Sequence, residues 1–218
     1  MNRDNGFESR RASMVDCQLR ARGIESPLVL EAMGRVARER FVPERMRDCA
    51  YDDSPLPIGA GQTISQPYIV ALMTEALDLE GGERVLDIGT GSGYAAAVLG
   101  CIAGEVFSIE RVEELADRAA RTLAAEGFDN VEVCCGDGTM GWPEHQPYDG
   151  IVVAAGAPAV PDSLKHQLVV GGHLVIPVGS EHSVQTLMRV TRLAENEFRT
   201  DNLGAVRFVP LLGEQGWS

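Results

Sequence analysis

The sequence has no apolar run long enough to cross a lipid bilayer. None of its uninterrupted apolar segments approaches the roughly 18 residues that a membrane-spanning helix needs. The first eleven residues are polar and charged, and no apolar segment follows them, so no signal peptide is visible. We therefore expect a cytoplasmic protein that has no membrane partner.

Cysteine and histidine are scarce, and neither forms a ligand pattern. The five cysteines are Cys17, Cys49, Cys101, Cys134 and Cys135, and the four histidines are His145, His166, His173 and His182. An odd number of cysteines without a C-x-x-C pair argues against a disulfide framework and against a zinc site. We expect no metal cofactor and interpret these residues as structural or surface residues.

Positive charge is also in short supply. The chain has 19 Lys and Arg residues against 32 Asp and Glu residues, a formal net charge of −13. Such a surface repels phosphate backbones. Basic residues are dense only at Arg10–Arg11 and between Arg35 and Arg47, where Glu39 and Glu44 interrupt them, as on a solvated helix face. We expect no nucleic-acid partner, and we expect a monomer.

The length of 218 residues suits one α/β domain. Apolar residues recur at helical spacing as far as about Arg47, and Ser26-Pro27 is typical of a helix N-cap followed by proline at the first helical position. Tyr51 to Gln66 is rich in proline and glycine and is too long for a simple connector, which favours a functional loop. We expect residues 1–66 to form N-terminal helices and this loop, and residues 67–218 to form the α/β core.

Strands alternate with helices through the rest of the chain, which predicts a doubly wound, Rossmann-like parallel sheet. The expected helices are 67–79, 94–102, 112–126 and 161–168. The expected strands are 84–88, 105–109, 131–135, 149–154 and 173–178, followed by an antiparallel edge hairpin of 186–193 and 203–211. The fold class predicted is therefore a mostly parallel seven-stranded α/β sheet with an N-terminal helical extension.

The strongest local signal is the run Asp87-Ile-Gly-Thr-Gly-Ser-Gly93, where the first strand of the core ends. Ligands of such sheets lie outside the carboxyl ends of the strands. A dinucleotide fingerprint would require glycine at Tyr94. The pattern D-x-G-x-G-x-G instead resembles the first motif of S-adenosylmethionine-dependent methyltransferases. The helix that follows would favour the methionine carboxylate at its N-terminus.

The next two strands end in acidic residues. Glu110 is placed to accept hydrogen bonds from ribose hydroxyls, and Asp137 to accept from the adenine amino group. Considered alone, Glu110 would be a surface glutamate, and its register with the glycine turn reverses this interpretation. The alternative for Asp137 is a turn residue between glycines. Three successive strands with suitable ends are a more specific signal than any one of them.

The chain from about Cys17 to Gly213 resembles the protein-L-isoaspartate O-methyltransferase family. The most specific part is the loop Leu56-Pro-Ile-Gly-Ala-Gly-Gln-Thr-Ile-Ser-Gln-Pro-Tyr-Ile-Val70, which general methyltransferases lack. Further similar segments are 38–42, 85–94, 136–138 with Trp142, 171–179, and 206–210 as a closing strand. Two departures are Gly156, where alanine is common, and the tail Glu214–Ser218, for which we expect no clear counterpart.

This resemblance implies a methyltransferase that acts on the free α-carboxylate of L-isoaspartyl residues in damaged proteins, with D-aspartyl residues as a second candidate. Its cofactor would be S-adenosylmethionine, with S-adenosylhomocysteine as product, and Ser65 would be the catalytic residue. The implied cofactor-binding residues are Gln62, Thr63, Ile64, Ser65, Asp87, Gly89, Thr90, Gly91, Ser92, Gly93, Glu110, Arg111, Asp137 and Gly138.

The chemistry agrees with the lack of a catalytic triad. A carboxylate is already ionised at pH 7 and needs no general base to attack a sulfonium methyl group. The protein then supplies positioning and a dry site, worth roughly 7–11 kcal/mol. We expect Ser65 to orient the attacking carboxylate. The alternative from the sequence is that Ser65 caps the helix starting at Pro67.

Other functions remain as rivals. Amino-methylating enzymes of nucleic-acid bases carry an Asn- or Asp-Pro-Pro-aromatic motif after the fourth strand, where this chain has Ala154-Ala-Gly-Ala-Pro158, and cytosine-C5 enzymes need a Pro-Cys pair that is absent here. An enzyme acting on hydroxyl groups of small molecules would usually need a base or a metal. A non-enzymatic cofactor-binding module is disfavoured by the intact loop around Ser65. Another carboxylate or a small molecule is the main alternative substrate.

Overall fold

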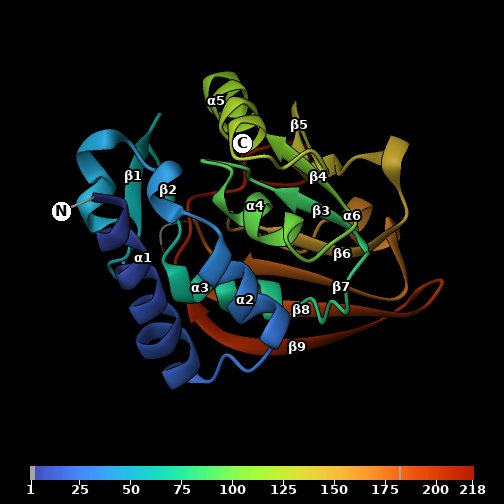
Figure 1. Ribbon diagram of the computed structural model, residues 1–218. Helices are drawn as coiled ribbons and strands as arrows, with labels where there is room; N and C mark the ends of the chain where they lie inside the picture. Colours follow the sequence, from blue (N-terminus) through green and yellow to red (C-terminus); the bar gives the residue numbers. More distant parts are fainter. Residues whose placement is uncertain (1–2, 182) are drawn as a thin grey trace.

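The structure, a computed structural model, describes residues 3–181 and 183–218 (Figure 1). Within this part of the chain the main sheet has seven strands in the order β5-β4-β3-β6-β7-β8-β9. Their bounds are β3 Arg84–Ile88, β4 Glu105–Glu110, β5 Val131–Cys135, β6 Tyr148–Val153, β7 Leu168–Val178, β8 Gln185–Ala194 and β9 Glu197–Val206. The five neighbouring strands β5, β4, β3, β6 and β7 pair in parallel, and β8 is antiparallel to both β7 and β9. The predicted mostly parallel seven-stranded sheet is confirmed.

The order of the strands places the expected ligand site. The chain adds β4 and β5 on one side of β3 and then continues with β6 on the other side. This reversal leaves a crevice at the carboxyl ends of β3 and β6, where open α/β sheets bind ligands. The glycine run follows β3 directly, so the topology puts it at the crevice.

Helices cover both faces of the sheet. Their bounds are α1 Arg3–Met14, α2 Pro27–Arg35, α3 Pro67–Glu75, α4 Tyr94–Gly100, α5 Glu113–Ala125 and α6 Asp162–His166. Successive strand side chains point to opposite faces, so Val85 packs into a core with the N-terminal helices, α3 and α4, whereas Leu86 packs into a second core with Leu164 of α6. Helices α1 and α2 form the expected N-terminal extension beside the sheet (Figure 1), and Ser26 caps α2 by accepting from the Val29 N–H at 3.4 Å.

The segment predicted as a loop contains a small antiparallel hairpin. Strand β1, Leu56–Gly59, pairs with β2, Gln62–Ile64. The tight turn between them has positive φ at Gly59, Ala60 and Gly61. The hairpin shortens the path from the N-terminal helices to α3 and gives residue 65 a fixed position at the end of a strand.

Three predicted boundaries are wrong. Strand β7 begins at Leu168 and not at residue 173, because the exposed segment before His173 continues the strand. The last strand is β9, 197–206, and not 203–211, because β8 turns back at Ala194 and the charged segment after it forms an exposed edge strand. Residues 207–210 therefore do not form a closing strand; they run beside Gly156 instead, with the Gly156 N–H donating to Val209 O at 2.8 Å. Helix α3 ends at Glu75 and not at Leu79, since Asp78 has positive φ.

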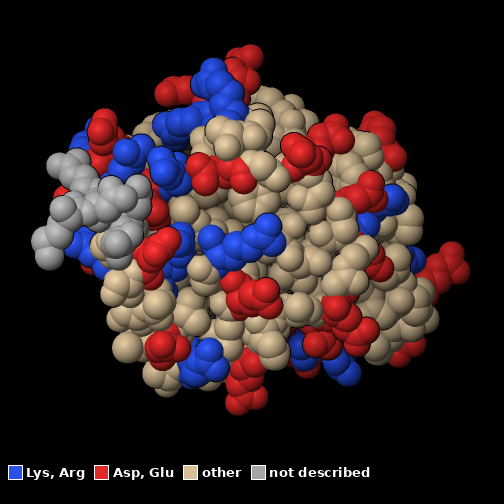
Figure 2. All heavy atoms as spheres, viewed as in Figure 1, with Lys and Arg blue, Asp and Glu red and all other residues tan. Residues whose placement is uncertain are grey.

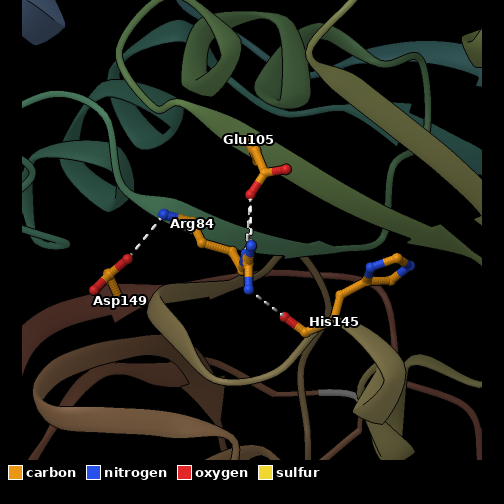
Figure 3. Close-up of polar contacts among 4 residues, drawn as sticks. All are labelled: Arg84, Glu105, His145 and Asp149. Atoms are coloured by element: carbon orange, nitrogen blue, oxygen red, sulfur yellow. Dashed lines mark hydrogen bonds and ion pairs between the residues drawn. The ribbon is translucent and has the colours of Figure 1, made fainter.

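Arg84 ties together the amino ends of three strands, opposite the crevice (Figure 3). Its guanidinium donates to Glu105 Oε2 at 2.7 Å and to the His145 carbonyl at 3.4 Å, and its backbone N–H donates to Asp149 Oδ2 at 2.8 Å. The His145 ring stacks on Phe107 with centroids 4.0 Å apart, which supports a structural role for this histidine. His182 lies outside the described residues.

Candidate active site

The glycine turn after β3 is bound to the end of the neighbouring strand. The N–H groups of Gly89 and Thr90 donate to the Ile109 carbonyl at 2.8 and 3.2 Å. Gly89 and Gly91 have φ of 92° and 55°, values that strain any residue with a side chain. A Cβ at Gly91 would also lie 3.4 Å from the Ile58 side chain. The turn is thus fixed in a shape that only glycine takes easily.

Glu110 holds this turn from the end of β4. Its side chain is 7% exposed, and its two carboxylate oxygens accept from the Gly91 N–H at 2.8 Å and from the Val112 N–H at 2.9 Å. The sequence predicted a ligand contact for Glu110 but not this bond to the glycine turn. Each carboxylate oxygen keeps a further acceptor site, so the carboxylate can fix the turn and still meet a ligand.

Asp87 is fully buried under the turn and does not line the cavity. One of its oxygens accepts from Ser108 Oγ at 2.7 Å, Ser108 in turn lies 2.6 Å from Thr90 Oγ1, and the other Asp87 oxygen has no partner. Burial, with a contribution from the charge of Glu110 and against the Ser108 hydrogen bond, raises the pKa of Asp87 to about 6. Its position indicates that it supports the turn from beneath.

Ser65 follows the hairpin and precedes α3. Helix α3 is capped at Gln66 without any side-chain bond, so Ser65 is not its capping residue and the alternative interpretation is wrong. The Ser65 carbonyl accepts from the buried guanidinium of Arg38 at 2.7 Å. The side chain of Ser65 is half-buried and lines the cavity next to the glycine turn.

One cavity brings most of the expected residues together. Its lining includes Gln62, Thr63, Ile64, Ser65, Gly89, Thr90, Gly91, Ser92, Glu110, Arg111 and Gly138. It also includes residues that the sequence did not single out, chiefly Val70, Tyr94, Ala95, Ile109, Val112, Ala154, Ala155 and Val209–Leu212. Most of these are apolar wall residues, whose type gives no local signal in a sequence. Gly93 and Asp137, like Asp87, lie outside the lining.

Asp137 is bound to the C-terminal tail. Its Oδ1 accepts from the Thr139 N–H and hydroxyl at 2.9 and 2.7 Å, and its Oδ2 accepts from the Glu214 N–H at 2.8 Å. Partial burial acts to raise the pKa of Asp137, but these hydrogen bonds, led by that of Glu214, lower it overall. The expected contact with adenine stays a prediction, and the bond to Glu214 is one that the sequence did not indicate.

A second cavity adjoins the first. It lies between the end of the hairpin and residues 205–209, with Val206 and Phe208 in its wall. Ser65 and Thr63 line both cavities. Ser65 therefore stands at the boundary, where a group in one cavity can meet a group in the other.

The charges and apolar segments fit this picture without adding a further site. Acidic and basic side chains are mixed on the face in Figure 2, where they form separate groups between large uncharged areas. In residues 3–181 and 183–218, no three His, Cys, Asp or Glu side chains gather as a metal site would require. No helix in the described part of the chain has the length and apolar character needed to cross a membrane.

Comparison with known proteins identifies relatives over the whole chain. Residues 9–216 match the family model for protein-L-isoaspartate (D-aspartate) O-methyltransferase. The match includes most of the tail that we expected to have no counterpart. Protein-L-isoaspartate O-methyltransferase 2 of Marinobacter nauticus is 63% identical over 218 residues, the full length of both chains. Protein-L-isoaspartate O-methyltransferase 1 of Rhodopseudomonas palustris is 63% identical over 212 residues, 97% of this chain and 86% of that one.

Solved structures agree with the sequence relatives. A protein-L-isoaspartate O-methyltransferase with 30% identity superposes with a TM-score of 0.84 over 94% of this chain and 67% of that one. A Plasmodium falciparum structure, described as a putative protein-L-isoaspartate O-methyltransferase in complex with S-adenosyl-L-homocysteine, has 26% identity and a TM-score of 0.80, over 93% and 98% of the two chains. The chain described here belongs to the protein-L-isoaspartate (D-aspartate) O-methyltransferase family.

Proposed function

We propose that this protein transfers a methyl group from S-adenosylmethionine to the free α-carboxylate of L-isoaspartyl residues in damaged proteins, which initiates their repair. The observation that carries the proposal is the position of Ser65 between two adjoining cavities, one beside the glycine turn and one beside residues 205–209. Membership of the family supports the same reaction.

The first cavity fits S-adenosylmethionine. Gly89 and Gly91 let the backbone turn at its edge, and the Glu110 carboxylate lines it with acceptor capacity for the ribose hydroxyls. Apolar side chains such as Ile109 and Leu211 supply surfaces on which a flat adenine ring can pack. We assign the lining residues from 62–65, 89–92, 110–111 and Gly138 to cofactor binding, with Asp87 and Gly93 supporting the turn.

The protein acts by holding the reactants. S-adenosylmethionine supplies an electrophilic methyl group: a carboxylate oxygen forms the new C–O bond as the C–S bond breaks, and its electron pair stays on sulfur as S-adenosylhomocysteine. Ser65 donates a hydrogen bond from its hydroxyl group to the incoming carboxylate. This bond orients the carboxylate toward the methyl group across the boundary between the cavities. Within residues 3–181 and 183–218, no histidine lines either cavity, in keeping with a nucleophile that is already ionised.

The second cavity is the proposed site of the substrate. Residues 205–209 and the end of the hairpin frame it, and an extended peptide can lie there through main-chain contacts that tolerate many flanking sequences. An isoaspartyl linkage carries the chain through the side-chain carbon and leaves the α-carboxylate free. We propose that the site accepts this carboxylate, with that of D-aspartyl residues as a second candidate.

The alternative is a carboxylate on a small molecule. The test is transfer of labelled methyl from S-adenosylmethionine to an isoaspartyl hexapeptide, compared with free isoaspartate and simple dicarboxylates at equal concentration. We expect base-labile methyl ester only on the peptide, because the second cavity is open to flanking residues. Equal or faster methylation of the free acids would support the alternative.

We also propose that residues 1–218 form a single methyltransferase domain. In it, residues 1–66 supply the N-terminal helices and the substrate and catalytic loop, whose end at 62–65 also lines the cofactor cavity, and residues 67–218 supply the cofactor-binding α/β core and the C-terminal strands. A monomer located in the cytoplasm is the corresponding proposal for assembly and location. Sedimentation of the purified protein at micromolar concentration checks the first of these two, with a species near the chain mass of 23.5 kDa expected.

A further inference from the structure

Arg38 is a buried cation that none of the roles assigned above uses. Its side chain has 0% exposure, and it lies in the segment between α2 and the hairpin. The Nε atom donates to the Ala50 carbonyl at 2.7 Å and Nη2 donates to the Ser65 carbonyl at 2.7 Å. One guanidinium therefore joins two loop segments, one of which carries the proposed catalytic residue.

The same guanidinium lies over an aromatic ring of the cofactor cavity. Its central carbon is 4.7 Å from the ring centroid of Tyr94, the first residue of α4, and Tyr94 lines the cavity beside the glycine turn. Arg38 thus touches both walls of the site, the hairpin end at Ser65 and the helix that follows the glycines. A shift of one wall relative to the other would change this set of contacts.

Fold stability alone accounts poorly for an arginine at this position. The Nη1 atom has no hydrogen-bond partner, and no carboxylate in the described residues forms an ion pair with Arg38. Burial lowers the pKa of the guanidinium, which nevertheless stays charged at neutral pH. A buried cation without a counter-charge costs free energy, and an apolar side chain of similar size would often be as stable. The charge and its two donated bonds therefore suggest a functional reason.

We infer that Arg38 is a positioning residue, which sets the direction of the Ser65 side chain by holding its carbonyl group. The inference rests on the proposed function. The bond to Arg38 fixes the 65–66 peptide plane after the Ser65 α-carbon, and the pairing of Ile64 with Leu56 in the hairpin fixes the chain before it. Together they set the direction of the Cα–Cβ bond that carries the hydroxyl. No side-chain cap holds the start of α3, and within the described part of the chain the Ser65 carbonyl is held by the bond from Arg38. A guanidinium has the rigid fork that reaches two carbonyls at once, whereas a lysine is a point donor.

The test uses Arg38→Met and Arg38→Lys in the full chain, with wild type and Arg84→Met as references. Arg84 is also a partly buried arginine that donates to a backbone carbonyl, but it lies at the opposite end of the sheet. The measurements are kcat and KM for an isoaspartyl hexapeptide, the dissociation constant of S-adenosylhomocysteine by calorimetry, and the melting temperature. We expect Arg38→Met to lower kcat by about 10- to 100-fold, as small misplacements at active sites do, while the dissociation constant changes by less than about 2-fold.

Arg38→Lys should keep more of the kcat than Arg38→Met, because its ammonium group can still donate to one of the two carbonyls. Arg84→Met should lower the melting temperature and leave kcat within about 2-fold. A kcat of Arg38→Met within 2-fold of wild type would overturn the inference, as would an equal loss of kcat in Arg84→Met. If Arg38→Met does not fold, Arg38→Lys decides by the same criterion. A wild-type protein inactive on the isoaspartyl peptide would overturn the proposed function itself, a result separate from any difference among the variants.

Discussion

Glu110 illustrates how one carboxylate can serve structure and binding together. It accepts from the backbone on both sides, at Gly91 and at Val112, and still faces the cavity. The resemblance in sequence assigned only the ligand contact. Because the same group shapes the glycine turn, its replacement affects affinity both directly and through the turn.

Glu110→Gln should therefore weaken cofactor binding while the fold is kept. The amide has one acceptor oxygen instead of two, so a charge-assisted bond to a backbone N–H or to a ribose hydroxyl is lost, at about 1.5–3 kcal/mol. Calorimetry with S-adenosylhomocysteine should show an affinity lower by about 10- to 100-fold. Unchanged affinity in a folded variant would remove Glu110 from the site.

Asp87 makes the stability of the protein depend on pH in a particular direction. Its folded pKa of about 6 lies above the ordinary value of 3.8. The stabilisation of the fold by protonated Asp87 is fully present below about pH 4 and is lost as the pH rises through about 6. It is lost because the carboxyl group releases its proton at lower pH in the unfolded chain than in the folded one. Relative to wild type, the unfolding free energy of Asp87→Asn should rise by about 2 kcal/mol between pH 4.5 and pH 7. Urea unfolding of both proteins at pH 4.5 and pH 7 measures this, and a constant difference would contradict the burial of a titrating carboxyl here.

Ser65→Ala separates orientation from folding. Since Ser65 does not cap α3 and its carbonyl bond to Arg38 needs no hydroxyl, the variant should fold normally and bind cofactor with nearly unchanged affinity. Its kcat on an isoaspartyl peptide should fall by about 10- to 100-fold, which corresponds to the loss of one hydrogen bond to a charged group. A kcat equal to that of wild type would move the catalytic assignment elsewhere in the Gln62–Pro67 segment.

The C-terminal tail closes over the ends of three strands. Arg111 after β4 donates to the Leu212 carbonyl at 3.3 Å, Asp137 after β5 accepts from Glu214, and Gly156 after β6 accepts from the Trp217 indole at 3.0 Å. Leu211 and Leu212 then form part of the cavity wall. The tail thus helps to build the wall of the proposed cofactor site.

Asp137→Asn should loosen this tail. An asparagine in the same place offers an NH₂ group to one of the two donors that Asp137 accepts from, so the bond to the Glu214 N–H or that to Thr139 is lost, at about 1–3 kcal/mol. Hydrogen exchange should become faster at Glu214 and Gln215, and cofactor affinity should fall by several-fold. Exchange rates equal to those of wild type at both amides would contradict a role of Asp137 in holding the tail.

The regular elements of the core could be predicted because their signals are local. Strand β3 is a short apolar run ending in glycines, and α5 has apolar residues at helical spacing between β4 and β5. The start of strand β9 was not predicted because its first residues are charged and exposed, and only pairing with β8 makes them a strand. The hairpin of β1 and β2 was not predicted because its proline and glycine residues are typical of loops and not of strands.

The candidate site divides along the same line. Residues on the glycine turn, Glu110 and the Ser65 segment were found from motif and resemblance. The wall formed by Val209–Leu212, and the link from Arg38 to Ser65, join parts of the chain far apart in sequence, so no local pattern announces them. For Asp137, the sequence placed the residue at the end of a strand, as the structure has it. It did not indicate that the carboxylate accepts a hydrogen bond from the C-terminal tail.

The substrates of the proposed reaction share one chemical feature, a free α-carboxylate, which the two adjoining cavities must recognise in many sequence contexts. A formal net charge of −13 gives no general attraction for carboxylates, so selection must come from the site itself. The shape around Ser65 has to distinguish an α-carboxylate exposed by an isoaspartyl linkage from the side-chain carboxylate of ordinary aspartate.

The measurement that tests this most directly uses two peptides of identical sequence, one with isoaspartate and one with aspartate at the same position. Labelled methyl transfer from S-adenosylmethionine is followed for each at equal concentration, and kcat/KM is compared. We expect rapid formation of methyl ester on the isoaspartyl peptide and a rate at background level on its aspartyl twin. Equal rates on the two peptides, or methylation of the aspartyl peptide alone, would contradict it.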